Sequence, residues 1–79
     1  MYILANNYQS NDSLPYVVSV ELFPSLNSAL KAAHDLAEDA IVNEYGEKYS
    51  ESELETTYDG RDTYIKGPDF LDWWTVIEC

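Results

Sequence analysis

The strongest constraint on the fold is one long amphipathic segment, PSLNSALKAAHDLAEDAIVNEYG, which covers residues 24–46. Its apolar side chains recur at helical spacing and share one face: Leu26, Ala29, Leu30, Ala33, Leu36, Ala37, Ala40 and Ile41. Ser25 suits an N-cap and Gly46 suits a C-terminal stop, so we expect the main helix at about residues 25–45. Because this face is rich in alanine, the helix can lie close against a sheet.

Two strand patterns precede the helix. Residues 2–5 form a short apolar run, and residues 16–23 (YVVSVELF) alternate, with Tyr16, Val18, Val20 and Leu22 predicted on one face. Residues 6–15 are rich in Asn, Ser and Asp, which predicts a loop. We therefore expect an antiparallel hairpin with a long connection.

Further strand patterns follow the helix. Residues 54–67 (LETTYDGRDTYIKG) predict two short strands around an Asp59-Gly60 turn, and residues 73–79 (WWTVIEC) predict a final strand. The pattern does not decide the structure of residues 47–57. The whole chain of 79 residues is predicted to be one α+β domain, a small antiparallel sheet with one main helix on one face, in the order β-β-α-β-β(-β).

Negative charge is concentrated in and after the predicted helix. The chain has a formal net charge of −11, and residues 33–62 alone contain ten acids and two bases. Asp35, Glu38 and Asp39 are three or four residues apart, where like charges destabilise a helix by about 0.2–0.5 kcal/mol per pair. Glu44 and Glu47 lie near the helix C-terminus, where the macrodipole favours cations. Because the charge opposes helix stability, we infer that it serves a partner.

The predicted partner is a basic nucleic-acid-binding protein. A row of acids can imitate the phosphates that such proteins bind through Lys and Arg. Tyr45 and Tyr49 flank the helix end and suit an interface, and Val42 is an apolar residue among the charges. The predicted partner-binding residues are Asp35, Glu38, Asp39, Val42, Glu44, Tyr45, Glu47, Tyr49, Glu51, Glu53 and Glu55.

The sequence lacks the residue patterns that catalysis or metal binding would need. Cys79 and His34 are the only residues of their types, so a Cys/His metal site is excluded by count. No calcium-loop spacing and no glycine-rich phosphate loop is present. Carboxylates on an exposed helix face lack the cleft that would tune their pKa for acid–base work. We therefore expect no enzyme, cofactor or metal site.

The start of the chain, MYILANNY, has neither the basic region nor the apolar run of a signal peptide. No segment approaches the length of a transmembrane helix. We therefore expect a complete cytoplasmic protein that binds neither membrane nor nucleic acid directly, with a homodimer as a further option.

In size, acidity, the direct start MYILANNY and the acidic helix HDLAEDAIVNEY, the chain resembles small phage-encoded inhibitors of host nucleic-acid machinery. Anti-CRISPR proteins are the largest such group, and the uracil-DNA glycosylase inhibitor is another example. The resemblance covers the whole chain in style and no specific motif, so no residue roles carry over. It implies stoichiometric binding in the host cytoplasm to a CRISPR effector or another DNA enzyme, for instance at the arginines that read DNA.

Two other functions fit the same sequence. One is an immunity or antitoxin-like partner of a basic toxin, which would use the same electrostatics. The other is a phage accessory protein whose acidity serves only solubility, with its function in the sheet face or a dimer interface.

Overall fold

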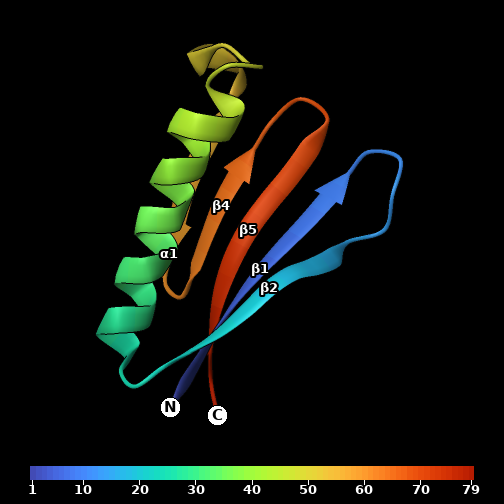
Figure 1. Ribbon diagram of the computed structural model, residues 1–79. Helices are drawn as coiled ribbons and strands as arrows, with labels where there is room; N and C mark the ends of the chain where they lie inside the picture. The colour runs from blue at the N-terminus through green and yellow to red at the C-terminus, as the bar shows by residue number, and fades with distance from the viewer.

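The computed structural model describes all 79 residues as a five-stranded antiparallel sheet with one helix packed on one face (Figure 1). The strands lie in the order β2-β1-β5-β4-β3. Their bounds are β1 Tyr2–Ser10, β2 Tyr16–Phe23, β3 Glu55–Asp59, β4 Asp62–Lys66 and β5 Phe70–Glu78. This confirms the predicted α+β class and element order. The first and last strands are neighbours at the centre of the sheet.

Helix α1, Leu26–Ala40, begins and packs as its sequence predicts. The Ser25 side chain accepts a hydrogen bond from the backbone N–H of Ser28, which satisfies one of the free donors at the helix start. The side chains of Ala29, Ala33 and Ala37 are completely buried against the sheet. Small side chains at these positions allow the helix to sit close to the strands.

The apolar face of the helix is narrower than predicted, and its end has a different form. Leu36 is 42% exposed, so it lies at the edge of the buried face. After Ala40 the chain continues as a π-helical turn, Ile41–Tyr45, before it turns at Gly46. The wider turn places the Tyr45 ring in the core instead of on the surface.

Strand β1 is more than twice as long as predicted, and the prediction that residues 6–10 form a loop was wrong. Asn6, Asn7 and Ser10 have low strand propensity, but β1 is hydrogen-bonded on both sides, to β2 and β5. The side chain of Asn6 also finds polar partners beneath the helix, and Tyr8 stacks on Phe70. Tertiary pairing therefore overrides the local preference.

The predicted alternation in β2 is broken by a bulge. The register with β1 shifts between Asn6 and Asn7, so that Ser19 pairs with Asn6 and Val17 pairs with Asn7, leaving Val18 unpaired. Tyr16, which pairs with Tyr8, faces the helix side, whereas Val20 and Leu22 face the opposite side. The four residues predicted on one face are therefore divided between both faces.

The region after the helix contains a 3₁₀ turn and a tight hairpin. The segment that the sequence left undecided forms the turn Glu51–Glu53 and then enters β3. The β3–β4 hairpin turns at Gly60 and Arg61, one residue later than predicted, with Gly60 at φ 60°. A positive φ at the first central position is typical of a type II′ turn and favours glycine there.

The sheet has one covered face and one open face. Phe70, Trp74 and Val76 of β5 lie in the core beneath the helix. Trp73 is half-buried and points the other way, as expected for adjacent strand residues. We define the open sheet face by the apolar side chains that β2, β1 and β5 present away from the helix: Val17, Val20, Leu22, Ile3, Ala5, Leu71, Trp73 and Ile77.

Candidate functional site

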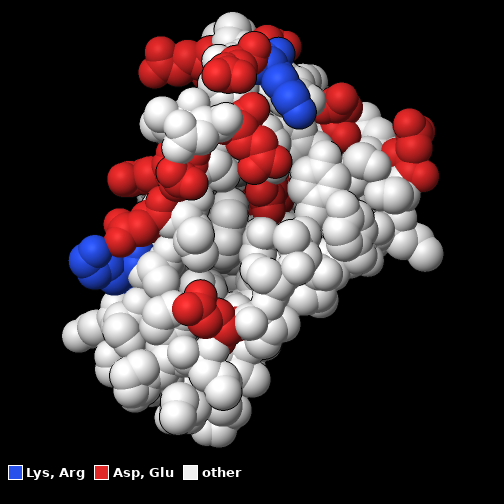
Figure 2. Space-filling model, in the orientation of Figure 1, with Lys and Arg blue, Asp and Glu red and all other residues white.

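The acidic side chains gather along the exposed side of α1 and around its C-terminal end (Figure 2). We define the acidic surface as these exposed residues: Asp35, Glu38, Asp39, Glu44, Glu47 and Glu51. Val42, which is 70% exposed, lies on the same helical segment. Most of the predicted partner-binding residues are thus exposed, and they lie between residues 35 and 51.

The acidic surface has almost no internal neutralisation. Lys31 and Asp35 form the only ion pair of the chain, at 2.8 Å between Nζ and Oδ2, and both side chains are well exposed. Such a pair contributes little to stability. The Asp39 carboxylate accepts a hydrogen bond from the neutral Asn43 amide at 2.6 Å. Most of the negative charge is therefore available to an external cation.

Four of the predicted partner-binding residues have other surroundings. Tyr45 is only 5% exposed. Glu55 pairs across the strands with Lys66, on the side of the sheet away from the helix. Glu53 accepts hydrogen bonds from the backbone and hydroxyl of Ser50, and these bonds lower the pKa of its carboxyl. Tyr49 donates a hydrogen bond to Asp69 at 2.7 Å. Tyr45 and Glu55 therefore lie away from the acidic surface, whereas Glu53 and Tyr49 are hydrogen-bonded within the protein.

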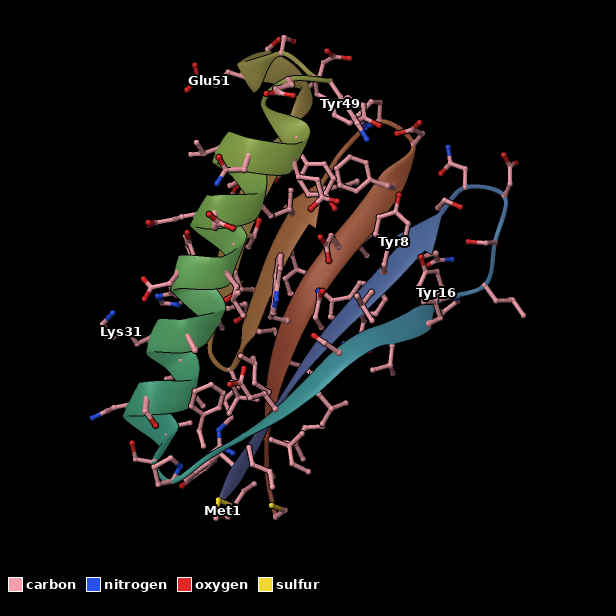
Figure 3. The ribbon with its side chains drawn as sticks, viewed as in Figure 1. Met1, Tyr8, Tyr16, Lys31, Tyr49 and Glu51 are labelled. Atoms are coloured by element: carbon pink, nitrogen blue, oxygen red, sulfur yellow. The ribbon has the colours of Figure 1, made fainter.

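A hollow of about 370 Å³ lies on the helix side of the sheet, beside the C-terminal end of the helical segment. We call it the tyrosine hollow and define it by its lining residues: Asn6, Tyr8, Tyr16, Val18, Glu44, Tyr45, Lys48, Tyr49 and Asp72. Figure 3 shows Tyr8 and Tyr16 on the strand side, with Tyr49 at the end of the helical segment. The hollow exists because α1 does not cover the upper parts of β1 and β2 (Figure 1).

Asp72 links two other residues that line the hollow through hydrogen bonds. Its Oδ2 accepts a hydrogen bond from the Tyr45 hydroxyl at 2.6 Å, and its Oδ1 accepts one from the Asn6 amide at 2.7 Å. Burial raises the pKa of the Asp72 carboxyl, and these two hydrogen bonds partly offset that rise. Burial and the bond to Asp72 also raise the pKa of the Tyr45 hydroxyl. The result is a buried polar network in which each side chain is satisfied.

Sequence reasoning missed this network, although one signal of it was present. In FLDWWTVIE the side chains at alternate positions 70, 72, 74 and 76 face the core, so Asp72 is an acid in phase with Phe70, Trp74 and Val76. A charged residue at a core position needs a partner. Its partners Asn6 and Tyr45 come from distant parts of the chain, and no local pattern links them.

Comparison with known proteins gives no relative: no protein-family model, curated protein or solved structure matches the chain. None of the helices is long and apolar enough to cross a bilayer.

Proposed function

We propose that this protein is a non-enzymatic inhibitor that binds a basic, nucleic-acid-binding surface of another protein through its acidic surface. The observation that carries the proposal is a row of exposed carboxylates with one ion pair among them. The carboxylates on this surface repel one another and contribute little to the stability of the fold. Binding to Lys and Arg side chains would relieve that repulsion.

The spacing of the acids supports imitation of a phosphate backbone. Asp35, Glu38 and Asp39 lie on the exposed side of α1 and span four residue steps, which is about 6 Å along a helix axis. That is one charge per roughly 3 Å, close to the ~3.4 Å per phosphate along one DNA strand. A groove that accommodates a strand of phosphates can therefore meet several of these carboxylates at once.

The test is a charge reversal on the acidic surface. The tagged protein is incubated with bacterial lysate, and retained proteins are eluted with double-stranded DNA or with salt. We expect the wild-type chain to retain a DNA-binding protein that DNA displaces, and the double variant Glu38→Lys, Asp39→Lys to retain none. Removing two like charges beside Asp35 also relieves repulsion, so the helix of this variant should remain folded.

The matched control is Asp12→Lys with Asp59→Lys. Both residues are exposed: Asp12 lies in the connection between β1 and β2, and Asp59 is the last residue of β3. The change in net charge is the same as in the test variant. This control should retain the partner. Equal loss of binding in both double variants would show that total charge matters and not the acidic surface, which would contradict the proposal.

The open sheet face favours a second candidate function, in which two copies of the chain associate and the acidity only maintains solubility. No charged side chain of β2, β1 or β5 points to this face, so two copies can meet there with their acidic surfaces apart. Three strands of about eight residues cover roughly 14 by 26 Å. That is less than the ~800 Å² per partner of a standard interface, so we expect a weak dimer.

Sedimentation velocity up to millimolar concentration tests this second candidate. We expect concentration-dependent association that Val20→Lys with Leu22→Lys abolishes. The control Val42→Lys changes an exposed apolar residue of the helical segment, far from this face, and should leave association unchanged. A wild-type protein that stays monomeric throughout would exclude this candidate.

A further inference from the structure

Asp72 is a buried carboxylate without a cation. It is 5% exposed, and its two hydrogen-bond donors, the Tyr45 hydroxyl and the Asn6 amide, are both neutral. The only ion pair of the protein lies elsewhere, between Lys31 and Asp35. Buried charges in proteins are usually paired, because a neutral environment compensates the lost hydration incompletely. This carboxylate is therefore hydrogen-bonded but has no cationic partner within the protein.

The carboxylate also has unused capacity to accept hydrogen bonds. An ionised Asp offers about four lone-pair sites, and the network uses two. Asp72 lines the tyrosine hollow, whose volume of about 370 Å³ lies at the small end of the ~300–1,000 Å³ typical of ligand sites. A small donor group that enters the hollow can therefore reach Asp72.

The walls of the hollow are aromatic. Tyr45 stacks on Phe70 with ring centroids 4.5 Å apart, and Tyr8 stacks on the same ring at 6.1 Å. Tyr16 lies 5.8 Å from Tyr8, and Tyr49 lies 6.4 Å from Tyr45. Tyr8 with Tyr16 and Tyr45 with Tyr49 thus form two aromatic pairs, and both pairs contact the Phe70 ring in the core. Aromatic faces attract cations, and they favour a planar guanidinium, which stacks on a ring and is weakly hydrated.

We propose that the tyrosine hollow binds the guanidinium group of an arginine side chain, with Asp72 accepting its hydrogen bonds and the tyrosine rings stacking against it. The source of the arginine rests on the proposed function, in which the partner is a basic protein. Arginine is the residue that such proteins use most to contact phosphates in a bidentate manner. Glu44 joins this hollow to the acidic surface, because it belongs to both.

Lys48 allows a test of whether the hollow prefers a positively charged ligand. It is exposed, lines the hollow and makes no ion pair. Its ammonium group raises the local potential and opposes entry of a second cation. Lys48→Met keeps most of the apolar stem and removes the charge, so this variant should bind arginine more tightly. Glu44→Gln removes a rim carboxylate and should bind it more weakly.

The experiment is a nuclear magnetic resonance titration of the full chain with the peptide acetyl-Gly-Arg-Gly-amide. We expect saturable shifts in the Asn6 side-chain amide and in the backbone amides of Tyr45, Tyr49 and Asp72. The same peptide with citrulline in place of arginine is neutral and nearly isosteric, and it should give no saturable shift. Equal binding of the citrulline peptide, or no localised shift with the arginine peptide, would overturn the proposal.

Variants then separate the site from the fold. Asp72→Asn should weaken arginine binding by about tenfold or more, because it removes the charged acceptor. Tyr16→Ala removes a 55% exposed ring at the rim and leaves the core intact, so it should also weaken binding. Tyr58→Ala removes an equally exposed tyrosine outside the hollow and is the matched control. Equal effects of the two alanine variants would contradict a site at the hollow.

The two proposals fail in different ways. The peptide titration tests the hollow alone, whereas retention of a lysate protein tests the acidic surface. If Glu38→Lys with Asp39→Lys loses the partner but binds the peptide, the hollow is an independent site and the proposal stands. If Asp72→Asn loses peptide binding but retains the partner with unchanged salt resistance, the partner's arginine is not the occupant, and that part of the proposal is overturned.

Discussion

Removal of one hydroxyl group, by Tyr45→Phe, should reveal what the buried network contributes to stability. The Tyr45 ring packs in the core against Phe70, and phenylalanine preserves that packing. What disappears is the hydrogen bond of 2.6 Å to Oδ2 of Asp72. Asp72 is only 5% exposed, so water replaces the lost donor less completely there than it would at the surface. Loss of the donor should also raise the pKa of the Asp72 carboxyl further.

The expected cost follows from this loss. A buried acceptor left without its donor costs about 1–3 kcal/mol, and the value should lie in the upper half because the acceptor is charged. A domain of this size unfolds in urea with a slope of about 1 kcal/mol per molar. The midpoint of unfolding should therefore fall by about 2–3 M. Trp74 lies in the core and provides a fluorescence signal for the transition.

Tyr49→Phe is the matched control. The Tyr49 hydroxyl makes a bond of nearly the same length, 2.7 Å, to Asp69, but this pair lies at the surface. Water can replace the lost donor there, so the free energy of unfolding should change by less than about 0.5 kcal/mol. Equal costs for the two variants, or no cost for Tyr45→Phe, would refute the view that burial makes this network important.

Three further predictions concern Asp72, Gly67 and Ser25. A carboxyl pKa raised above its ordinary 3.8 means that Asp72 favours folding when protonated, and this contribution is lost as the pH rises from about 4 through the raised pKa. In urea titrations between pH 3 and pH 7, Asp72→Asn should therefore gain stability relative to wild type as the pH rises; a constant difference would contradict this. Gly67→Ala places a methyl group on the Phe70 ring, so it should cost about 1–3 kcal/mol and alter the near-ultraviolet circular dichroism, and an unchanged spectrum would count against the overlap. Ser25→Ala removes the bond to the Ser28 N–H and should cost about 1 kcal/mol, a drop of about 4–8 °C in melting temperature, whereas a drop below about 1 °C would mean the cap is unimportant.

The helix could be predicted because its information is local. Ser25, the alanines and Gly46 follow one another along the chain, and each acts within a few residues. The same holds for the hairpin around Gly60, where one residue with positive φ determines the turn. The acidic surface was predictable for the same reason, since its residues lie on consecutive turns of one segment.

The features that could not be predicted depend on distant partners. Asn6 lies in a strand because β5 pairs beside it and Asp72 accepts its amide hydrogen bond, 66 residues away. The bulge at Val18 appears only in the register against β1. Tyr45 was expected at the surface because its neighbours are charged, but the π-helical turn rotates its ring into the core. Local patterns contain none of this information.

The central position of β5 has a consequence for how the protein is made. Pairing of β1 with β5 joins the two ends of the domain, and it also separates the β1–β2 hairpin from the β3–β4 hairpin. Until residues 70–78 have left the ribosome, these two hairpins have no common strand, and an apolar edge of β1 stays unpaired. The nascent chain therefore cannot close its sheet before β5 has left the exit tunnel.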